Sequence, residues 1–105
     1  MHSTPLVDKQ GFLVNLEDWD AEVASVIALN EGIALSQAHW EIINVLRSFY
    51  QEYTLSPAMR ILVKTVKAEL GPEKGNSLYL LNLFPGSPAM LASKIAGLPK
   101  PTNCL

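Results

Sequence analysis

Apolar residues recur at every third or fourth position over much of the chain, a spacing that predicts a mainly helical protein. The most regular stretch continues through four turns and predicts a helix over 36–53, which Ser36 would cap. A second helix is predicted over 56–70, because Ser56 and Pro57 supply a cap and a proline suited to a first turn. Its apolar positions share one face: Met59, Leu62, Val63, Val66 and Leu70.

Three shorter helices are predicted around these two. The first begins after a capping Asp18 and ends at Gly32, with a core face formed by Trp19, Val23, Val26 and Ile27. The second covers 77–84, is capped by Ser77 or Asn76, and carries Leu78, Leu81 and Phe84 on its core face. The last begins at Ser87-Pro88 and ends near Gly97.

The start of the chain predicts a short β-hairpin. Leu6-Val7 and Phe12–Val14 flank a four-residue turn that ends in Gly11. Pro5 limits the first arm to an edge or a frayed end. The expected fold class is therefore α+β but mainly α. It is a small orthogonal helical bundle with a helix-turn-helix-like pair, made of the two longest helices, and a minor N-terminal hairpin.

The last eight residues predict an extended arm. Pro99 and Pro101 remove backbone donors and push the residues before them toward extended backbone. We expect a mobile, semi-rigid arm that carries Cys104, the penultimate residue, away from the body. The predicted organisation is one domain, 1–105, with a hairpin region (1–15), a helical body (16–97) and the arm (98–105).

Composition narrows the class of protein. A chain of 105 residues with 49% apolar and 17% charged residues is one packed domain and is not intrinsically disordered. No apolar run approaches the length of a membrane span, and the start has no secretory pattern. A single cysteine excludes internal disulfides and a four-cysteine zinc site, and it fits a reducing compartment. We expect a cytoplasmic protein without membrane contact.

Charge is unevenly distributed. The formal net charge is -2, which excludes a general nucleic-acid-coating polycation, yet residues 56–105 hold six bases against two acids. Arg60, Lys64 and Lys67 share one face of a predicted helix. That strip is either a solvated face or a surface for an acidic partner, the anionic arm or tRNA. In a helix-turn-helix regulator it would enter the major groove of DNA, but the negative net charge and a turn without glycine disfavour this alternative.

Cys104 is the candidate catalytic residue. A thiolate is a nucleophile, and a cysteine beyond two prolines is difficult to bury. The sequence places no strong activating group beside it, so a partner's pocket would have to supply activation, as expected of a carrier. His39 lacks further metal ligands, and nothing brings Glu31 and Glu41 together as an acid–base pair. We therefore expect neither a metal nor a cofactor.

Several motifs resemble the TusE/DsrC/DsvC sulfur-carrier family. They agree in order and spacing from about residue 11 to the end, and only the first hairpin strand is shortened. The matching segments are His39-Trp-Glu41, Ser56-Pro-Ala-Met-Arg-Ile-Leu-Val-Lys64, Gly71-Pro-Glu-Lys-Gly-Asn-Ser77 and the ending Lys94-Ile-Ala-Gly-Leu-Pro-Lys-Pro-Thr-Asn-Cys-Leu105.

The resemblance implies a sulfurtransferase that accepts persulfide sulfur on Cys104. In the TusE branch a TusBCD-like complex donates the sulfur, and an MnmA-like tRNA 2-thiouridylase accepts it for wobble-uridine thiolation, so tRNA is involved indirectly. In the DsrC branch the arm enters dissimilatory sulfite reductase, and a second cysteine precedes the first by eleven residues. Ser93 occupies that position here and cannot form a disulfide, which favours the TusE branch.

Overall fold

The computed structural model describes residues 5–101, and Cys104 lies outside the described residues. A short 3-10 turn, η1 (Leu16–Asp18), precedes the α-helices. Five α-helices follow in the described part of the chain: α1 (Ala21–Asn30), α2 (Gln37–Tyr53), α3 (Met59–Leu70), α4 (Ser77–Leu83) and α5 (Pro88–Ile95). The mainly helical bundle predicted from the sequence is confirmed, and none of its helices is long and apolar enough to cross a membrane within residues 5–101.

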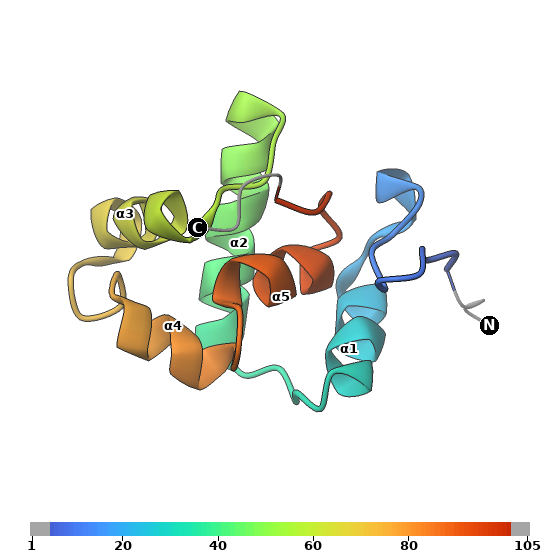
Figure 1. The fold of residues 1–105 in the computed structure, drawn as a ribbon, viewed down its shortest axis with the longest axis horizontal. Coiled ribbons are helices and arrows are strands. Elements are labelled where there is room, and N and C mark those ends of the chain that lie inside the picture. Colours follow the sequence, from blue (N-terminus) through green and yellow to red (C-terminus); the bar gives the residue numbers. More distant parts are fainter. Residues whose placement is uncertain (1–4, 102–105) are drawn as a thin grey trace.

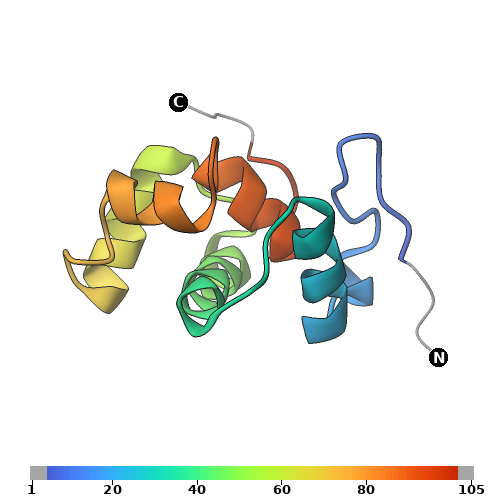
Figure 2. The same ribbon diagram turned by 90° about the horizontal axis from the view of Figure 1, so that it is seen from below.

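Helix α5 is the centre of the bundle. It packs against each of the other four α-helices, and Figure 1 shows it between α1 on one side and α3 and α4 on the other. Small side chains make this possible, because Ala89, Ala92 and Ser93 are all buried and let neighbouring helices approach closely. The view from below shows the same central position (Figure 2).

Helix α1 begins two residues later than the sequence predicts. Asp20 is the cap, since its Oδ1 accepts a hydrogen bond of 2.8 Å from the Val23 amide, whereas Asp18 belongs to η1. The core face also differs, because Val26 is 41% exposed while Ala24 and Ala28 are buried. Alanines form this face because α1 packs against α5, which presents small residues of its own.

Helix α3 begins at Met59 rather than at Ser56. Its predicted apolar face is confirmed, with Leu62 and Val66 fully buried and the other members partly buried. The predicted capping residue Ser56 instead lies buried in the connection between α2 and α3. Its hydroxyl therefore does not cap α3, whose N-cap residue is Ala58.

Helix α4 has the predicted cap but a different core face. The Asn76 side chain accepts a hydrogen bond of 2.9 Å from the Tyr79 amide. Leu80 and Phe84 are buried, whereas Leu78 is 70% exposed. Seven residues form too short a helix for apolar periodicity to identify its buried face.

The predicted N-terminal β-hairpin is not supported. Within residues 5–101 the backbone forms one isolated antiparallel bridge, between Val7 and Leu13, and no strand. Asp8 Oδ1 accepts hydrogen bonds from the Gln10 and Phe12 amides, which makes the segment a side-chain-stabilised turn. Val7 is exposed, so the first arm buries little apolar surface that could hold a longer two-stranded ladder.

Candidate functional site

The described part of the candidate site is the base of the arm that leads to Cys104. Helix α5 ends in a Schellman motif, in which the Leu98 amide donates to the Ser93 carbonyl oxygen (3.0 Å) and the Gly97 amide to that of Lys94 (3.1 Å). Gly97 has a φ of 73°, a conformation that glycine adopts without steric cost. Leu98 is buried directly after the turn, so the chain is redirected along the surface of the bundle.

Two side chains from other elements hold this turn. Trp19 Nε1 donates to the Ile95 carbonyl oxygen at 2.9 Å, and Arg47 Nη1 donates to that of Ala96 at 2.6 Å. The Arg47 guanidinium also stacks over the Trp19 ring, 3.8 Å from its centroid. These bonds satisfy carbonyl groups that a helix end leaves without partners. Partial burial lowers the pKa of Arg47, yet the group stays cationic at the negative end of the α5 dipole.

The first half of the predicted arm lies on the body. The Ser56 hydroxyl donates to the Pro99 carbonyl oxygen at 2.5 Å. Pro101 is buried, whereas Pro99 and Lys100 are exposed. Residues 98–101 of the predicted arm therefore rest on the body, because their tertiary contacts outweigh the tendency of an extended segment to remain free.

Ser93 is a buried polar group with an unsatisfied hydroxyl. Its side chain is fully buried in α5, and its Oγ has no hydrogen-bond partner among the described residues. The neighbouring buried residues Ala92 and Ile95 are apolar. A hydroxyl in such surroundings lowers stability, whereas a methyl or thiol group would fit there without needing a partner.

His39 ties α2 to α4. Its Nδ1 accepts a hydrogen bond from the Ser36 amide (3.1 Å), so Nε2 carries the proton that it donates to the Leu83 carbonyl oxygen (2.9 Å). The ring also meets Phe84 edge to face, with centroids 5.2 Å apart. His39 therefore caps the start of α2 and is buried. No group of three potential metal ligands occurs within residues 5–101.

Glu31 and Glu41 do not form a pair. Glu41 lies 2.7 Å from Lys74 Nζ, and Glu31 lies 3.0 Å from Lys94 Nζ. The hydrogen bond that Lys74 donates to Glu41 raises the pKa of Lys74 above its ordinary value. Each carboxylate is thus neutralised by a lysine, and neither contributes to an acid–base site.

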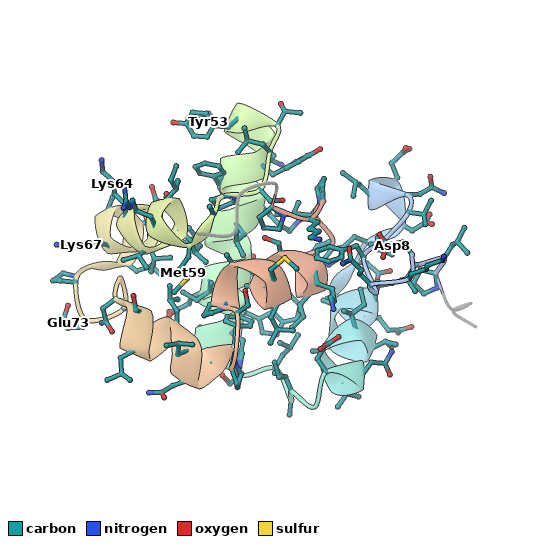
Figure 3. All side chains as sticks on the ribbon, in the orientation of Figure 1. Asp8, Tyr53, Met59, Lys64, Lys67 and Glu73 are labelled. Atoms are coloured by element: carbon teal, nitrogen blue, oxygen red, sulfur yellow. The ribbon has the colours of Figure 1, made fainter. Side chains whose placement is uncertain are left out.

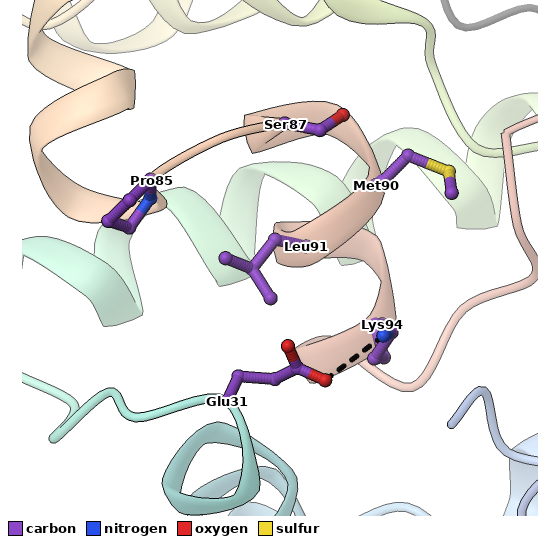
Figure 4. Close-up of a pocket in the computed structure, with 6 residues that line it drawn as sticks. All are labelled: Glu31, Pro85, Ser87, Met90, Leu91 and Lys94. Atoms are coloured by element: carbon purple, nitrogen blue, oxygen red, sulfur yellow. Dashed lines mark hydrogen bonds and ion pairs between the residues drawn. The ribbon is translucent and has the colours of Figure 1, made fainter. Parts of the chain in front are cut away.

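The Glu31–Lys94 ion pair borders a shallow hollow beside α5, shown in Figure 4. The residues that line it are Glu31, Pro85, Ser87, Met90, Leu91 and Lys94. Apart from the ion pair and one serine they are apolar, and none of their side chains takes part in the hydrogen bonds that hold the arm. The hollow therefore adds nothing to the arm site.

The basic strip of α3 is solvent-exposed. Lys64 and Lys67 project outward from the helix in Figure 3, and Arg60 is exposed as well. Within residues 5–101, no ion pair joins any of the three to a carboxylate. The strip begins four residues after Ser56, the residue that holds the arm.

Sequence reasoning missed most of the residues at the arm base. Trp19 was assigned to a core face and Ser56 to a helix cap, while Arg47 had no assigned role. Of the residues at the arm base, Gly97 alone had its role predicted, the end of the last helix, and the structure confirms it. A lone arginine within the apolar pattern of the longest helix was the one sequence feature that could have indicated a buried carbonyl partner.

Comparison with known proteins identifies a matching family, similar sequences and similar solved structures. The family model described as DsrC like protein matches residues 2–105. A protein named sulfurtransferase TusE from Sodalis glossinidius is 55% identical over 98 residues, covering 93% of this chain and 91% of its own. The structure of Allochromatium vinosum DsrC is 52% identical, with a TM-score of 0.85 over 94% of this chain and 88% of its own.

A second solved structure agrees. It is the oxidized γ-subunit of dissimilatory sulfite reductase (DsrC) from Archaeoglobus fulgidus, 42% identical, with a TM-score of 0.83 over 96% of this chain and 92% of its own. These names agree with the sulfur-transfer function predicted from the sequence and give no support to DNA binding. The chain belongs to the DsrC-like protein family, and its sequence is similar to proteins named sulfurtransferase TusE.

Proposed function

We propose that this chain is a TusE-type sulfurtransferase that carries sulfur on Cys104 within a relay. The supporting observation is the placement of the single cysteine of the sequence three residues beyond Pro101, which is packed against the body. A thiol at such a position can be presented to other proteins without disturbing the core. The proposed carrier is one domain, 1–105, with Cys104 as its catalytic residue.

The proposed reaction is a persulfide exchange. The Cys104 thiolate attacks the terminal sulfur of a donor persulfide, a new S–S bond forms on Cys104, and the donor cysteine leaves as a thiolate. An acceptor thiolate then attacks the terminal sulfur on Cys104 in the same way. The transferred sulfur keeps its oxidation state in both steps, so the exchange needs no external oxidant, metal or cofactor.

The TusE name of the relatives supports a role in a sulfur relay with other proteins. We propose a TusBCD-like complex as donor and an MnmA-like tRNA 2-thiouridylase as acceptor, which would make tRNA an indirect partner, in the cytoplasm. A DsrC-like role in dissimilatory sulfite reduction or another sulfur-oxidation complex is the alternative, and it is based on the similarity to solved DsrC structures. Ser93 weighs against that alternative, because its hydroxyl cannot provide the second thiol of the DsrC branch.

Intact-mass measurement tests the proposal. The reduced chain would be incubated with a cysteine desulfurase, cysteine and the relay proteins, and then measured under non-reducing conditions. We expect a gain of one sulfur atom that a reductant removes and that Cys104→Ser lacks, while Cys104→Ser folds normally. If an active relay adds no sulfur to the chain but mixing with sulfite reductase components does, the result favours the alternative.

A further inference from the structure

We propose that one face of the molecule docks an acidic protein surface while Cys104 exchanges sulfur. The face, here called the corner face, consists of Tyr53, Leu55, Arg60, Ile61, Lys64 and Lys67, at the end of α2 and along the outer side of α3. The inference rests on the proposed function and adds the chemistry of the surface that recognises the partner.

Chain length limits where a partner can sit. Cys104 is three residues beyond Pro101, and three extended residues span at most about 11 Å. Pro101 is packed against the body, and Pro99 is hydrogen-bonded to Ser56. While these contacts hold, the reacting sulfur of a partner has to come close to this part of the body.

The corner face lies within that neighbourhood. Ser56 precedes Arg60 by four residues, a separation of at most about 14 Å along the chain. Tyr53 precedes Ser56 by three residues, and Figure 3 shows it at the end of α2 on the side of Lys64. A protein large enough to enclose the thiol in a pocket would therefore cover this face.

Charge identifies the partner as acidic. Lys74 and Lys94 are paired with Glu41 and Glu31, but Arg60, Lys64 and Lys67 have no ion-pair partner within residues 5–101. Their spacing of four and three residues aligns them along one side of α3. Carboxylates on a partner would complement three aligned cations and would steer its approach.

Exposed apolar groups favour a protein over RNA. Tyr53, Leu55 and Ile61 are 56%, 52% and 47% exposed, and the Tyr53 ring lies against that of Phe49 at 4.6 Å between centroids. Aromatic and aliphatic side chains grouped beside arginine are typical of protein interfaces. A phosphate backbone would gain little from the exposed aliphatic side chains of Leu55 and Ile61.

Charge reversal tests the proposal. The rate of persulfide transfer to Cys104 would be measured against the concentration of a persulfide-loaded TusBCD complex, for the unmodified chain and for Lys64→Glu. We expect the half-saturating concentration to rise about tenfold at low salt, with the maximal rate within about twofold. Added salt should reduce the difference. Lys9→Glu, an equal charge change at an exposed lysine in the turn after Asp8, should behave like the unmodified chain.

Two further measurements separate the possible failures. Inorganic polysulfide, a small donor that needs no docking, should load Cys104 equally in every variant. Equal half-saturation for Lys64→Glu and Lys9→Glu would overturn the docking face and leave the sulfurtransferase proposal intact. If polysulfide loads the unmodified chain with sulfur but the TusBCD complex does not, both the proposed donor and the docking face are overturned. If Lys64→Glu loses affinity for tRNA and transfers sulfur at an unchanged rate, the corner face binds RNA and the proposal of a protein-docking face is overturned.

Discussion

The Ser56 hydroxyl lies 2.5 Å from the Pro99 carbonyl oxygen and joins two residues that are 43 positions apart in the sequence. This hydrogen bond holds the arm against the connection between α2 and α3. Together with the burial of Leu98 and Pro101, it fixes the described part of the arm on the body as far as Pro101, three residues before Cys104 in the sequence. The starting position of the arm that leads to Cys104 therefore depends on a side chain far from it in sequence.

Removal of this hydroxyl should loosen the arm. Ser56→Ala is expected to lower the free energy of unfolding by about 1 kcal/mol, the typical contribution of one hydrogen bond. The loss stays this small because Pro99 is exposed, so its carbonyl oxygen can accept a hydrogen bond from water in the variant. The ¹⁵N order parameter of the Lys100 amide should fall in the same variant. Ser48→Ala, at an exposed position of α2, should change neither quantity. An unchanged Lys100 order parameter in Ser56→Ala would show that this bond does not hold the arm.

Gly97→Ala should destabilise the turn at the arm base more than Gly86→Ala destabilises its own turn. A Cβ at this position would overlap the Trp19 ring, and the backbone φ is positive. Gly86 also has a positive φ, but a Cβ there would meet nothing within 4 Å. We expect a loss of about 3 kcal/mol for Gly97→Ala against about 1 kcal/mol for Gly86→Ala, measured by urea unfolding. Equal losses would mean that Trp19 moves aside without cost.

Ser93→Ala should stabilise the protein. The buried hydroxyl has no partner within residues 5–101, so its replacement by a methyl-sized side chain removes a desolvation cost of about 1 kcal/mol. Chemical denaturation would show this as a higher midpoint with an unchanged slope. Ser93→Cys should also be at least as stable as the unmodified chain. A loss of stability in Ser93→Ala would indicate that an ordered water satisfies the hydroxyl.

The Lys74–Glu41 ion pair should make stability depend on alkaline pH. Glu41 raises the pKa of Lys74, so the pair stabilises the folded state below the ordinary lysine value of 10.5 and loses this effect as the pH rises above it. The difference in unfolding free energy between the unmodified chain and Lys74→Met should stay constant from neutral pH to about pH 9 and then shrink. Lys67→Met, which removes a lysine without an ion pair in residues 5–101, should show no such pH dependence. The same alkaline change in both variants would contradict the assignment.

Local sequence predicted the helices because each is encoded by nearby residues. The apolar period through Ile42 and Leu46 identifies α2, and Asn76 caps α4 as its side-chain chemistry predicts. Family motifs also identified the sulfur-carrier family, which the comparisons confirm, and they singled out Cys104, whose catalytic role remains a prediction. The hairpin was wrong because its first arm buries too little apolar surface to pair as a strand.

The sequence by itself thus determined the helical class, most helix positions, the family and the candidate nucleophile. Tertiary structure alone decided that α5 is central, that Trp19 and Ser56 hold the arm, and that residues 98–101 lie on the body. The hydrogen bond from Trp19 to Ile95 joins residues 76 positions apart, and no local period encodes such a contact. It forms because small side chains on α5 allow close packing, and this packing brings distant donors to the carbonyl groups at the end of that helix.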